Sequence, residues 1–293
     1  MMRPRRGTFT ELDRADDRAI STILHFQSPS GGFAGGPANS QISHLLPTYG
    51  STCTLAMVGR PGPGGGWEEL AAKRQEMYDF FMRCKRPDGG FVVCVGGELD
   101  VRWVNCSDPL LLEYIEYQRL TKRGTYCLLV VATLLDIITP ELIHNVDKFI
   151  AGCQTYEGGF ACSSFPFANG GRAAQAEAHG GYTSCALNSY FLLSTIIPSG
   201  TTTSLGEFPM PIDVNAALRW SVLQQGEAVE AGGFRGRSNK LVDGCYSWWV
   251  GGGVPVVEAL AARANGVKEE PGKLDWRRVV KLMCSPATTF QSW

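Results

Sequence analysis

The feature that most constrains this fold is a Gly-Gly-Phe triplet that occurs four times along the 293-residue chain. After each triplet comes a cluster of small residues with a tyrosine, and this tyrosine opens an apolar run. A segment with the apolar spacing of a helix precedes the second, third and fourth triplets. The repeating unit is therefore helix, glycine-rich turn, helix. The triplets are Gly31–Phe33, Gly89–Phe91, Gly158–Phe160 and Gly232–Phe234.

The helical segments between the triplets indicate an all-α fold. One apolar stripe lies within residues 67–81, and a weaker one follows Pro211. The clearest stripe begins just after Pro140, a residue favoured at helix starts, and consists of Leu142, Ile143, Val146, Phe149, Ile150 and Cys153. A helical hairpin of this kind cannot bury its own apolar face, so it must stack on its neighbours. No segment alternates apolar and polar residues over any length as a strand does, and Ser163–Gln175 is predicted to be a flexible loop.

Composition narrows the functional class. The formal net charge of −1 gives no electrostatic attraction to nucleic acid or to a membrane surface. The ten cysteines contain no CxxC pair, so neither a disulfide framework nor a four-cysteine zinc finger is indicated. The first residues have no apolar signal region, and no apolar run is long enough to span a membrane. These features predict a cytoplasmic protein in a reducing compartment.

The segment Gly232–Trp249 combines three kinds of chemistry. Its cations, beside a tyrosine hydroxyl, are suited to an anionic group such as a diphosphate. Asp243 and Cys245 are a carboxylate and a thiol two residues apart, which is a ligand pair that zinc accepts. The alternative is that Asp243 caps a helix, that Cys245 is buried in the core, and that the cations are solvated. The cations are Arg235, Arg237 and Lys240, and the aromatic residues are Tyr246, Trp248 and Trp249.

Together, the repeats and this segment resemble the family of protein prenyltransferase β subunits, and its farnesyltransferase branch in particular. The matching stretches lie in about residues 25–102 and 124–263, and include SPSGGFAGG, LPTYGS, RPDGGFVVCVGGELDVR, EAHGGYTSC and GGFRGRSNKLVDGCYSWW. The resemblance implies an α-α toroid, in which helical-hairpin repeats close into a ring around a funnel lined with aromatic side chains. A single toroid domain over residues 13–293 is expected after a disordered N-terminus at residues 1–12.

The resemblance also implies a role for particular residues. Asp243 and Cys245 correspond to two zinc ligands. The residues that correspond to diphosphate ligands are His179, Arg237, Lys240 and Tyr246, with Tyr246 also taken as catalytic. The residues that correspond to the funnel wall or the isoprenoid pocket are Arg102, Tyr126, Tyr182, Cys185 and Trp249. The remaining histidines lie in no such motif and are expected to be surface or helix-packing residues; they are His25, His44 and His144.

The reaction that the resemblance implies joins a farnesyl group from farnesyl diphosphate to the cysteine thiol of a C-terminal CaaX peptide. Zinc would lower the pKa of that thiol, and Mg²⁺ is a second candidate cofactor. A prenyltransferase α subunit is the implied partner, in a heterodimer.

Three departures from the family affect these expectations. Residues 103–123 are extra, and their removal restores the string DVRGTYC, so they are either a retained intron or an insertion loop. The family's third zinc ligand, a histidine that follows a tyrosine, has no counterpart, so weak zinc binding is expected. The family's first helical repeat is missing ahead of Asp13. The chain is therefore expected to lack both ends of the toroid and to be inactive in this form.

Two other classes stay open at this point. Within the family, the alternative is the β subunit of a geranylgeranyltransferase. Outside it, a non-catalytic helical-repeat scaffold would bind no diphosphate. A terpene-cyclase-like toroid would need an acidic DDxxD or DxDD motif, and the sequence contains neither.

Overall fold

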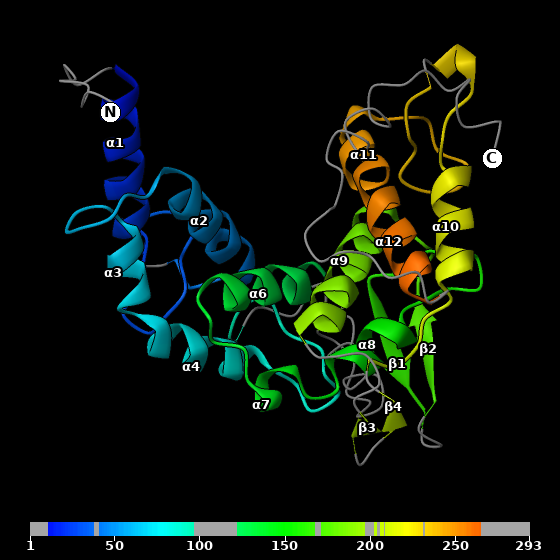
Figure 1. Cartoon of the computed structure of the whole chain (residues 1–293), viewed down its shortest axis with the longest axis horizontal. Helices are drawn as coiled ribbons and strands as arrows, with labels where there is room; N and C mark the ends of the chain where they lie inside the picture. Colours follow the sequence, from blue (N-terminus) through cyan, green and yellow to red (C-terminus); the bar gives the residue numbers. More distant parts are fainter. Residues whose placement is uncertain are drawn as a thin grey trace, which may run out of the picture. The chain divides into compact units, whose positions relative to one another are not determined.

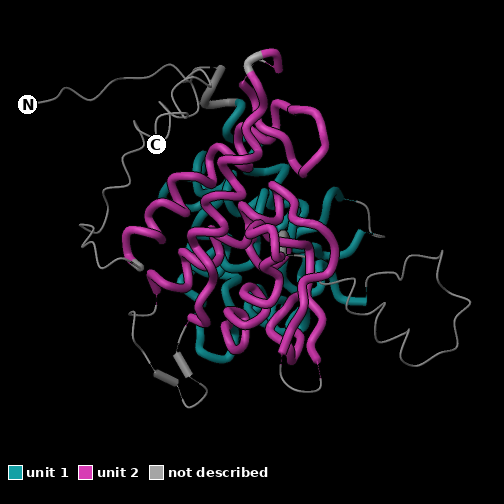
Figure 2. Tube along the Cα trace, turned by 90° about the vertical axis from the view of Figure 1, so that its right-hand side faces the viewer, with its two compact units in different colours: residues 1–85, 92–97, 127–142 teal, residues 86–91, 98–126, 143–293 magenta. Residues whose placement is uncertain are grey.

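A computed structural model describes residues 11–37, 41–96, 122–167, 171–196, 202–203, 206–207, 209–230 and 232–264. The described residues are mainly helical, with two short antiparallel strand pairs. They divide into two compact units, coloured separately in Figure 2. Unit 1 comprises residues 1–85, 92–97 and 127–142, and unit 2 comprises residues 86–91, 98–126 and 143–293. Arg102 and most of the predicted insertion at residues 103–123 lie outside the described residues.

Unit 1 is built from helices alone among its described elements. In chain order these are α1 (Glu11–His25), α2 (Leu45–Val58), α3 (Trp67–Ala71), α4 (Arg74–Cys84), most of α6 (Lys122–Leu134) and most of α7 (Pro140–Ile143), all labelled in Figure 1. Helix α2 packs on α1 and α3. The apolar stripe predicted at residues 67–81 is divided between α3 and α4, because Lys73 leaves the helical conformation (φ −104°, ψ 23°). Its members Leu70, Met77 and Phe81 are fully buried, as a core-facing stripe requires.

Unit 2 is centred on α9 (Gly180–Ile196), which packs on α8 (Val146–Gly152), α11 (Gly244–Trp249) and α12 (Val254–Ala264) (Figure 1). Helix α10 (Val214–Leu223) packs on α12. Nine residues of α9 are buried, on more than one face, so the helix lies within the unit rather than at its surface. Two 3₁₀ turns, η2 (Ala228–Glu230) and η3 (Gly251–Gly253), complete the helical elements, and the strands are β1 (Ser163–Pro166), β2 (Arg172–Gln175), β3 (Thr202–Thr203) and β4 (Gly206–Glu207).

The predicted repeat of helix, glycine-rich turn and helix is confirmed: the first three triplets fold into one kind of turn, and the fourth closes a longer turn, in which the Gly226 N–H donates to the Gly233 carbonyl (2.6 Å). In the third turn, the Gly158 N–H donates to the Thr155 carbonyl (3.0 Å) and the Thr155 N–H donates to the Gly159 carbonyl (2.9 Å). The first and second turns contain the equivalent pair of bonds. The four phenylalanines are all buried, with exposed fractions of 0% for Phe33, Phe91 and Phe160 and 7% for Phe234.

The first glycine of each triplet has a left-handed backbone conformation, with φ of +90° at Gly31, +93° at Gly89 and +104° at Gly158. A Cβ atom at these three positions would lie 1.9–2.2 Å from a backbone carbonyl oxygen of a helical segment in the next repeat. The three oxygens belong to Glu76, Asn145 and Ala216 respectively. Each turn therefore stacks its backbone directly on the following repeat, at a distance that only glycine permits.

A backbone hydrogen bond joins the start of the second helix to the phenylalanine of the triplet. The backbone N–H of His179 donates to the Phe160 carbonyl (3.1 Å), and the Phe160 N–H donates to Thr183 Oγ1 (2.9 Å). In the first repeat, the His44 N–H donates to the Phe33 carbonyl and the Phe33 N–H donates to Thr48 Oγ1. In the fourth repeat, the Asp243 N–H donates to the Phe234 carbonyl. The residue at this place is the one that opens α2, α9 or α11. His44 is thus the counterpart of His179, while His25 and His144 are exposed as expected.

The prediction of a flexible loop at Ser163–Gln175 is wrong. The described residues there form the antiparallel hairpin β1–β2, in which Ser163 pairs with Gln175 and Pro166 pairs with Arg172. Arg172 holds this hairpin in place, because it forms an ion pair with Asp88 of the second turn (3.1 Å) and donates from Nε to Ser164 Oγ (2.9 Å). These contacts join residues far apart in sequence, so local composition does not reveal them. A second short antiparallel pair, β3–β4, joins Thr202–Thr203 to Gly206–Glu207.

No helix among the described residues is long and apolar enough to cross a membrane.

The turn geometry predicts that Gly158→Ala destabilises the protein by about 2–4 kcal/mol, because the methyl group meets a backbone carbonyl and the φ of +104° is unfavourable. Gly62→Ala is the matched control, since Gly62 has a φ of +91° but no atom within 4 Å of its Cβ position. That change should cost about 1 kcal/mol through backbone strain alone. Urea unfolding measures both, and equal losses for the two variants would contradict the stacking contact.

Candidate functional site

The structure brings His179 and Tyr246 together, although 67 residues separate them in the sequence. His179 immediately precedes α9, and Tyr246 lies in the first turn of α11. The imidazole Nε2 is 3.0 Å from the phenol oxygen, and the two rings meet edge to face with centroids 5.6 Å apart. Both side chains are half-buried, so they are held in place and still accessible.

Two glycines determine where the Tyr246 ring lies. A Cβ atom on Gly236 would be 2.0 Å from Tyr246 Cζ, and one on Gly180 would be 3.0 Å from Tyr246 Cδ1. The two glycine backbones are also joined directly, because the Gly180 N–H donates to the Gly236 carbonyl (2.7 Å). The phenol ring therefore lies against bare backbone from two segments, and its hydroxyl is directed to His179.

The hydrogen bonds also assign the tautomer of His179. Its Nδ1 accepts from the Gly181 N–H (3.1 Å), so in the neutral imidazole the proton is on Nε2. The Nε2–H then donates to the Tyr246 oxygen, which leaves the hydroxyl hydrogen of Tyr246 to be donated to another acceptor. The pair is a hydrogen-bond donor set at the N-terminus of α9, where the helix dipole favours an anion.

Arg237 and Lys240 lie in one loop beside this pair. A bridge between Arg235 and Val242 closes the loop. Lys240 is exposed, and Arg237 forms an ion pair with Glu177, two residues before His179. The guanidinium of Arg235 pairs instead with Glu230 (2.9 Å).

Asp243 and Cys245 have converging side chains at the start of α11. Asp243 is the N-cap of the helix, and its carboxylate accepts from the Cys245 N–H (3.0 Å). This hydrogen bond, and a second one from the Cys245 side chain, hold the pKa of Asp243 below its usual value. Helix capping by Asp243 is therefore confirmed, whereas burial of Cys245 is wrong because the residue is exposed.

The donors at this place fit zinc in kind but do not complete a zinc site. A carboxylate oxygen and a thiolate sulfur are both accepted zinc ligands. In the part of the chain that the structure describes, no group of three or more His, Cys, Asp or Glu side chains is placed to hold a metal ion. Asp243 and Cys245 can supply two ligands, and a complete site needs at least one more.

Of the other predicted site residues, some lie near the His179 cluster and others lie in the core or at the surface. The Tyr182 ring lies 5.0 Å from the His179 ring, so it joins the cluster. Cys185, one turn further along α9, is only 2% exposed and belongs to the core. Trp249 is half-buried, Trp248 is 67% exposed, and Tyr126 is half-buried near the start of α6.

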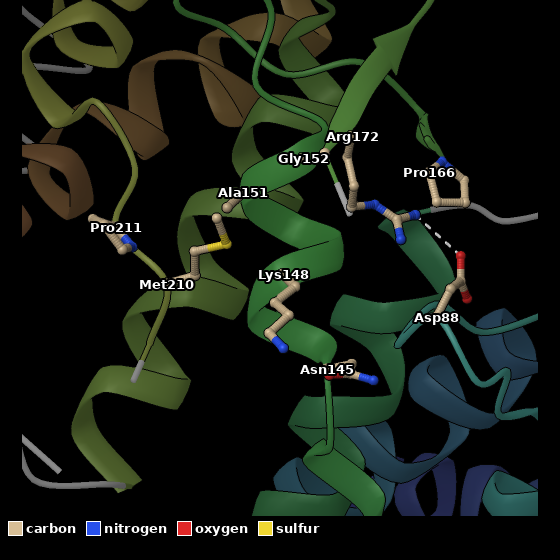
Figure 3. A pocket seen from close by; sticks show the side chains of 10 residues that line it. Asp88, Asn145, Lys148, Ala151, Gly152, Pro166, Arg172, Met210 and Pro211 are labelled. Carbon is tan, nitrogen blue, oxygen red and sulfur yellow. Dashed lines mark hydrogen bonds and ion pairs between the residues drawn. The ribbon is translucent and has the colours of Figure 1, made fainter. Parts of the chain in front are cut away.

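A cavity of about 660 Å³ lies elsewhere in unit 2 (Figure 3). One face of α8 lines it with Asn145, Lys148, Ala151 and Gly152, and the Asp88–Arg172 ion pair lies at its edge. Its other lining residues are Pro166, Gly171, Met210 and Pro211. None of the residues predicted for the functional site lines this cavity, so the cluster around His179 is a separate feature.

The fold and the site define a helical-repeat protein with a cationic, hydroxyl-bearing cluster at its helix starts, and comparison with known families agrees. The family described as "Prenyltransferase alpha-alpha toroid domain" matches residues 7–278. The chain belongs to this family, which confirms the fold class predicted from the repeats and motifs.

Several relatives share the resemblance. The chain is 36% identical over 249 residues to the protein farnesyltransferase subunit beta of Pisum sativum, which covers 85% of this chain and 46% of the relative. The corresponding subunit of Schizosaccharomyces pombe is 36% identical over 236 residues, covering 80% and 48%. The geranylgeranyl transferase type-1 subunit beta of Arabidopsis thaliana is 26% identical over 252 residues, covering 79% and 55%. The chain thus spans about half the length of these curated relatives.

A solved structure supports the fold independently. The Candida albicans protein geranylgeranyltransferase-I, complexed with GGPP, matches with a TM-score of 0.56 and 18% sequence identity. The match covers 94% of this chain and 69% of that chain. At this identity it shows the shared fold alone.

The contact between Gly236 and Tyr246 predicts a strong coupling between the two positions. Gly236→Ala should cost about 3 kcal/mol of stability in the natural background, because the methyl group overlaps the phenol ring. In a Tyr246→Ala background the same change should cost less than about 1 kcal/mol, since the overlapping ring is gone. A double-mutant cycle by urea unfolding measures the difference. Equal costs in the two backgrounds would show that the ring does not lie against Gly236.

Proposed function

We propose that this chain is a protein prenyltransferase β subunit that, with an α subunit, transfers a farnesyl group from farnesyl diphosphate to the cysteine thiol of CaaX proteins. The observation that carries the proposal is the cluster of His179, Tyr246 and Arg237. The Gly180–Gly236 hydrogen bond joins the segment of His179 to that of Arg237, and the Tyr246 ring packs against both glycines. Membership in the prenyltransferase family and the farnesyltransferase relatives support the same reaction class.

The cluster provides what a diphosphate leaving group requires. In the transfer, a carbon–sulfur bond forms at the first carbon of the isoprenoid while its carbon–oxygen bond breaks, so negative charge develops on the departing diphosphate. Arg237 and Lys240 offer positive charge, and Tyr246 and His179 offer neutral donors. Donors that are fixed before the reaction stabilise developing charge most effectively, and two glycine backbones fix the phenol here.

Asp243 and Cys245 would hold a zinc ion in this proposal, together with a ligand from outside the described residues. Zinc, when bound, favours the thiolate form of the substrate cysteine. The chain's own contribution is the orientation of its two donors, because the N-cap hydrogen bond fixes the Asp243 carboxylate next to the Cys245 thiol.

The isoprenoid pocket in this proposal begins at Tyr182, whose ring contacts His179, and includes Trp249. The farnesyl group is favoured over a longer isoprenoid because the relatives with the higher identities are farnesyltransferase subunits. Transfer of a geranylgeranyl group is the second candidate, supported by the Arabidopsis relative.

Arg237→Ala and Lys240→Ala should each weaken farnesyl diphosphate binding by about 5- to 30-fold, because each removes a charge-assisted contact worth about 1–2 kcal/mol. The measurement is the affinity of the chain, co-expressed with an α subunit, by fluorescence titration. Arg74→Ala is the control, since Arg74 is an exposed arginine on α4, in unit 1. If the two loop variants lose no more affinity than this control, the cluster does not hold the diphosphate. Titration with geranylgeranyl diphosphate separates the two candidate donors.

Zinc binding should be weak and should depend on Cys245. We expect Cys245→Ser to lower zinc affinity at least tenfold, whereas Cys53→Ser, at a half-buried cysteine of α2, should leave it unchanged. Competition with a chromophoric chelator measures both. Tight, stoichiometric zinc in the natural chain would show that the chain itself supplies the missing ligand.

A further inference from the structure

The proposed diphosphate site already contains an anion, which is the carboxylate of Glu177. Its Oε1 pairs with Nη1 of Arg237, and the two side chains are 54% and 39% exposed. Arg237 is therefore both the cation assigned to the diphosphate and the partner of an internal carboxylate. A guanidinium presents its N–H groups in a planar fork, so carboxylate and phosphate oxygens compete for the same donors.

We propose that Glu177 is a positioning residue that holds Arg237 in the ligand-free protein, yields it to the diphosphate, and takes it back as the product diphosphate leaves. The inference rests on the proposed function and goes beyond it by assigning a role in binding and release to a residue that touches no isoprenoid.

The exposure of the pair makes this exchange feasible. A solvent-exposed ion pair is weak, so a diphosphate, which carries more charge than a carboxylate, displaces Glu177 readily. Arg235 offers the contrast, because its pair with Glu230 is less exposed (25% and 21%) and Glu230 also accepts from the Glu227 N–H. Of these two arginines in the segment, Arg237 has the partner that a ligand can replace.

The position of Glu177 determines the sign of its effect. It lies two residues before His179, so its carboxylate stays close to the cluster after Arg237 has been given up. A negative charge there repels the bound diphosphate, and its return to Arg237 favours release. Removal of the charge should thus strengthen diphosphate binding, even though it removes a contact of the ligand-free protein.

The test is Glu177→Gln in the full chain co-expressed with an α subunit, with inorganic diphosphate as the probe. Calorimetry should show a three- to tenfold lower Kd, and stopped-flow should show correspondingly slower dissociation. Both effects should diminish at high salt, because the competing charges are exposed. Glu157→Gln is the matched control. Glu157 lines the same small cavity as Glu177 without an ion pair to Arg237, and its removal should change the Kd less than twofold.

Further variants distinguish a failure of the role of Glu177 from a failure of the proposed function. In an Arg237→Ala background, Glu177→Gln should strengthen binding clearly less than in the natural chain, because the competition for the guanidinium is gone and only the repulsion by the carboxylate remains to be removed. Glu177→Ala should give the same sign as Glu177→Gln, and thermal unfolding checks that both variants fold. An unchanged or weaker affinity in folded Glu177 variants would overturn the inference while Arg237→Ala still weakens binding. If instead the natural chain binds no diphosphate, the proposed function itself fails.

Discussion

The close approach of backbone to backbone at the Gly-Gly-Phe turns is the contact on which the rest of the structure depends. At Gly31, Gly89 and Gly158 the chain adopts a positive φ, and a helical segment of the next repeat presents a carbonyl within 2.2 Å of the missing Cβ position. The turn thus positions the next helix without any side chain between them. The buried phenylalanine that follows fills the space beside this contact, so turn and core are specified by the same three residues.

The turn also explains why the candidate functional side chains lie at the start of the second helix of a repeat. The carbonyl of a triplet phenylalanine accepts from the residue that opens the second helix, and this residue is His44, His179 or Asp243. The backbone position is the same in these three repeats, while the side chain differs. An imidazole there directs a donor outward from a helix N-terminus, whereas a carboxylate there offers a metal ligand. A structural repeat therefore supplies several sites of the same geometry, and single residues decide which chemistry each one has.

The sequence predicted most of the repeat but only part of the site. Triplets, apolar stripes and helix starts are local patterns; they identified the turns and placed Phe149 and Ile150 in the core, and they offered helix capping as the alternative role of Asp243. The hairpin β1–β2 was missed because the Asp88–Arg172 pair that anchors it joins distant segments. Glu177 was missed for the same reason, since only folding brings it to Arg237. In hindsight, an acid two residues before His179 was the available signal.

The dual role of Asp243 links the fold to the proposed metal chemistry. One carboxylate oxygen accepts the N–H of Cys245, so the cap fixes the side chain whether or not a metal is present. In the proposed function this carboxylate and the Cys245 thiolate would hold a metal ion, which competes with protons for both groups. The hydrogen bond that caps the helix therefore also fixes the Asp243 carboxylate beside Cys245. The described residues supply two donors, which do not close a zinc site, so zinc retention in the proposed function depends on a further ligand.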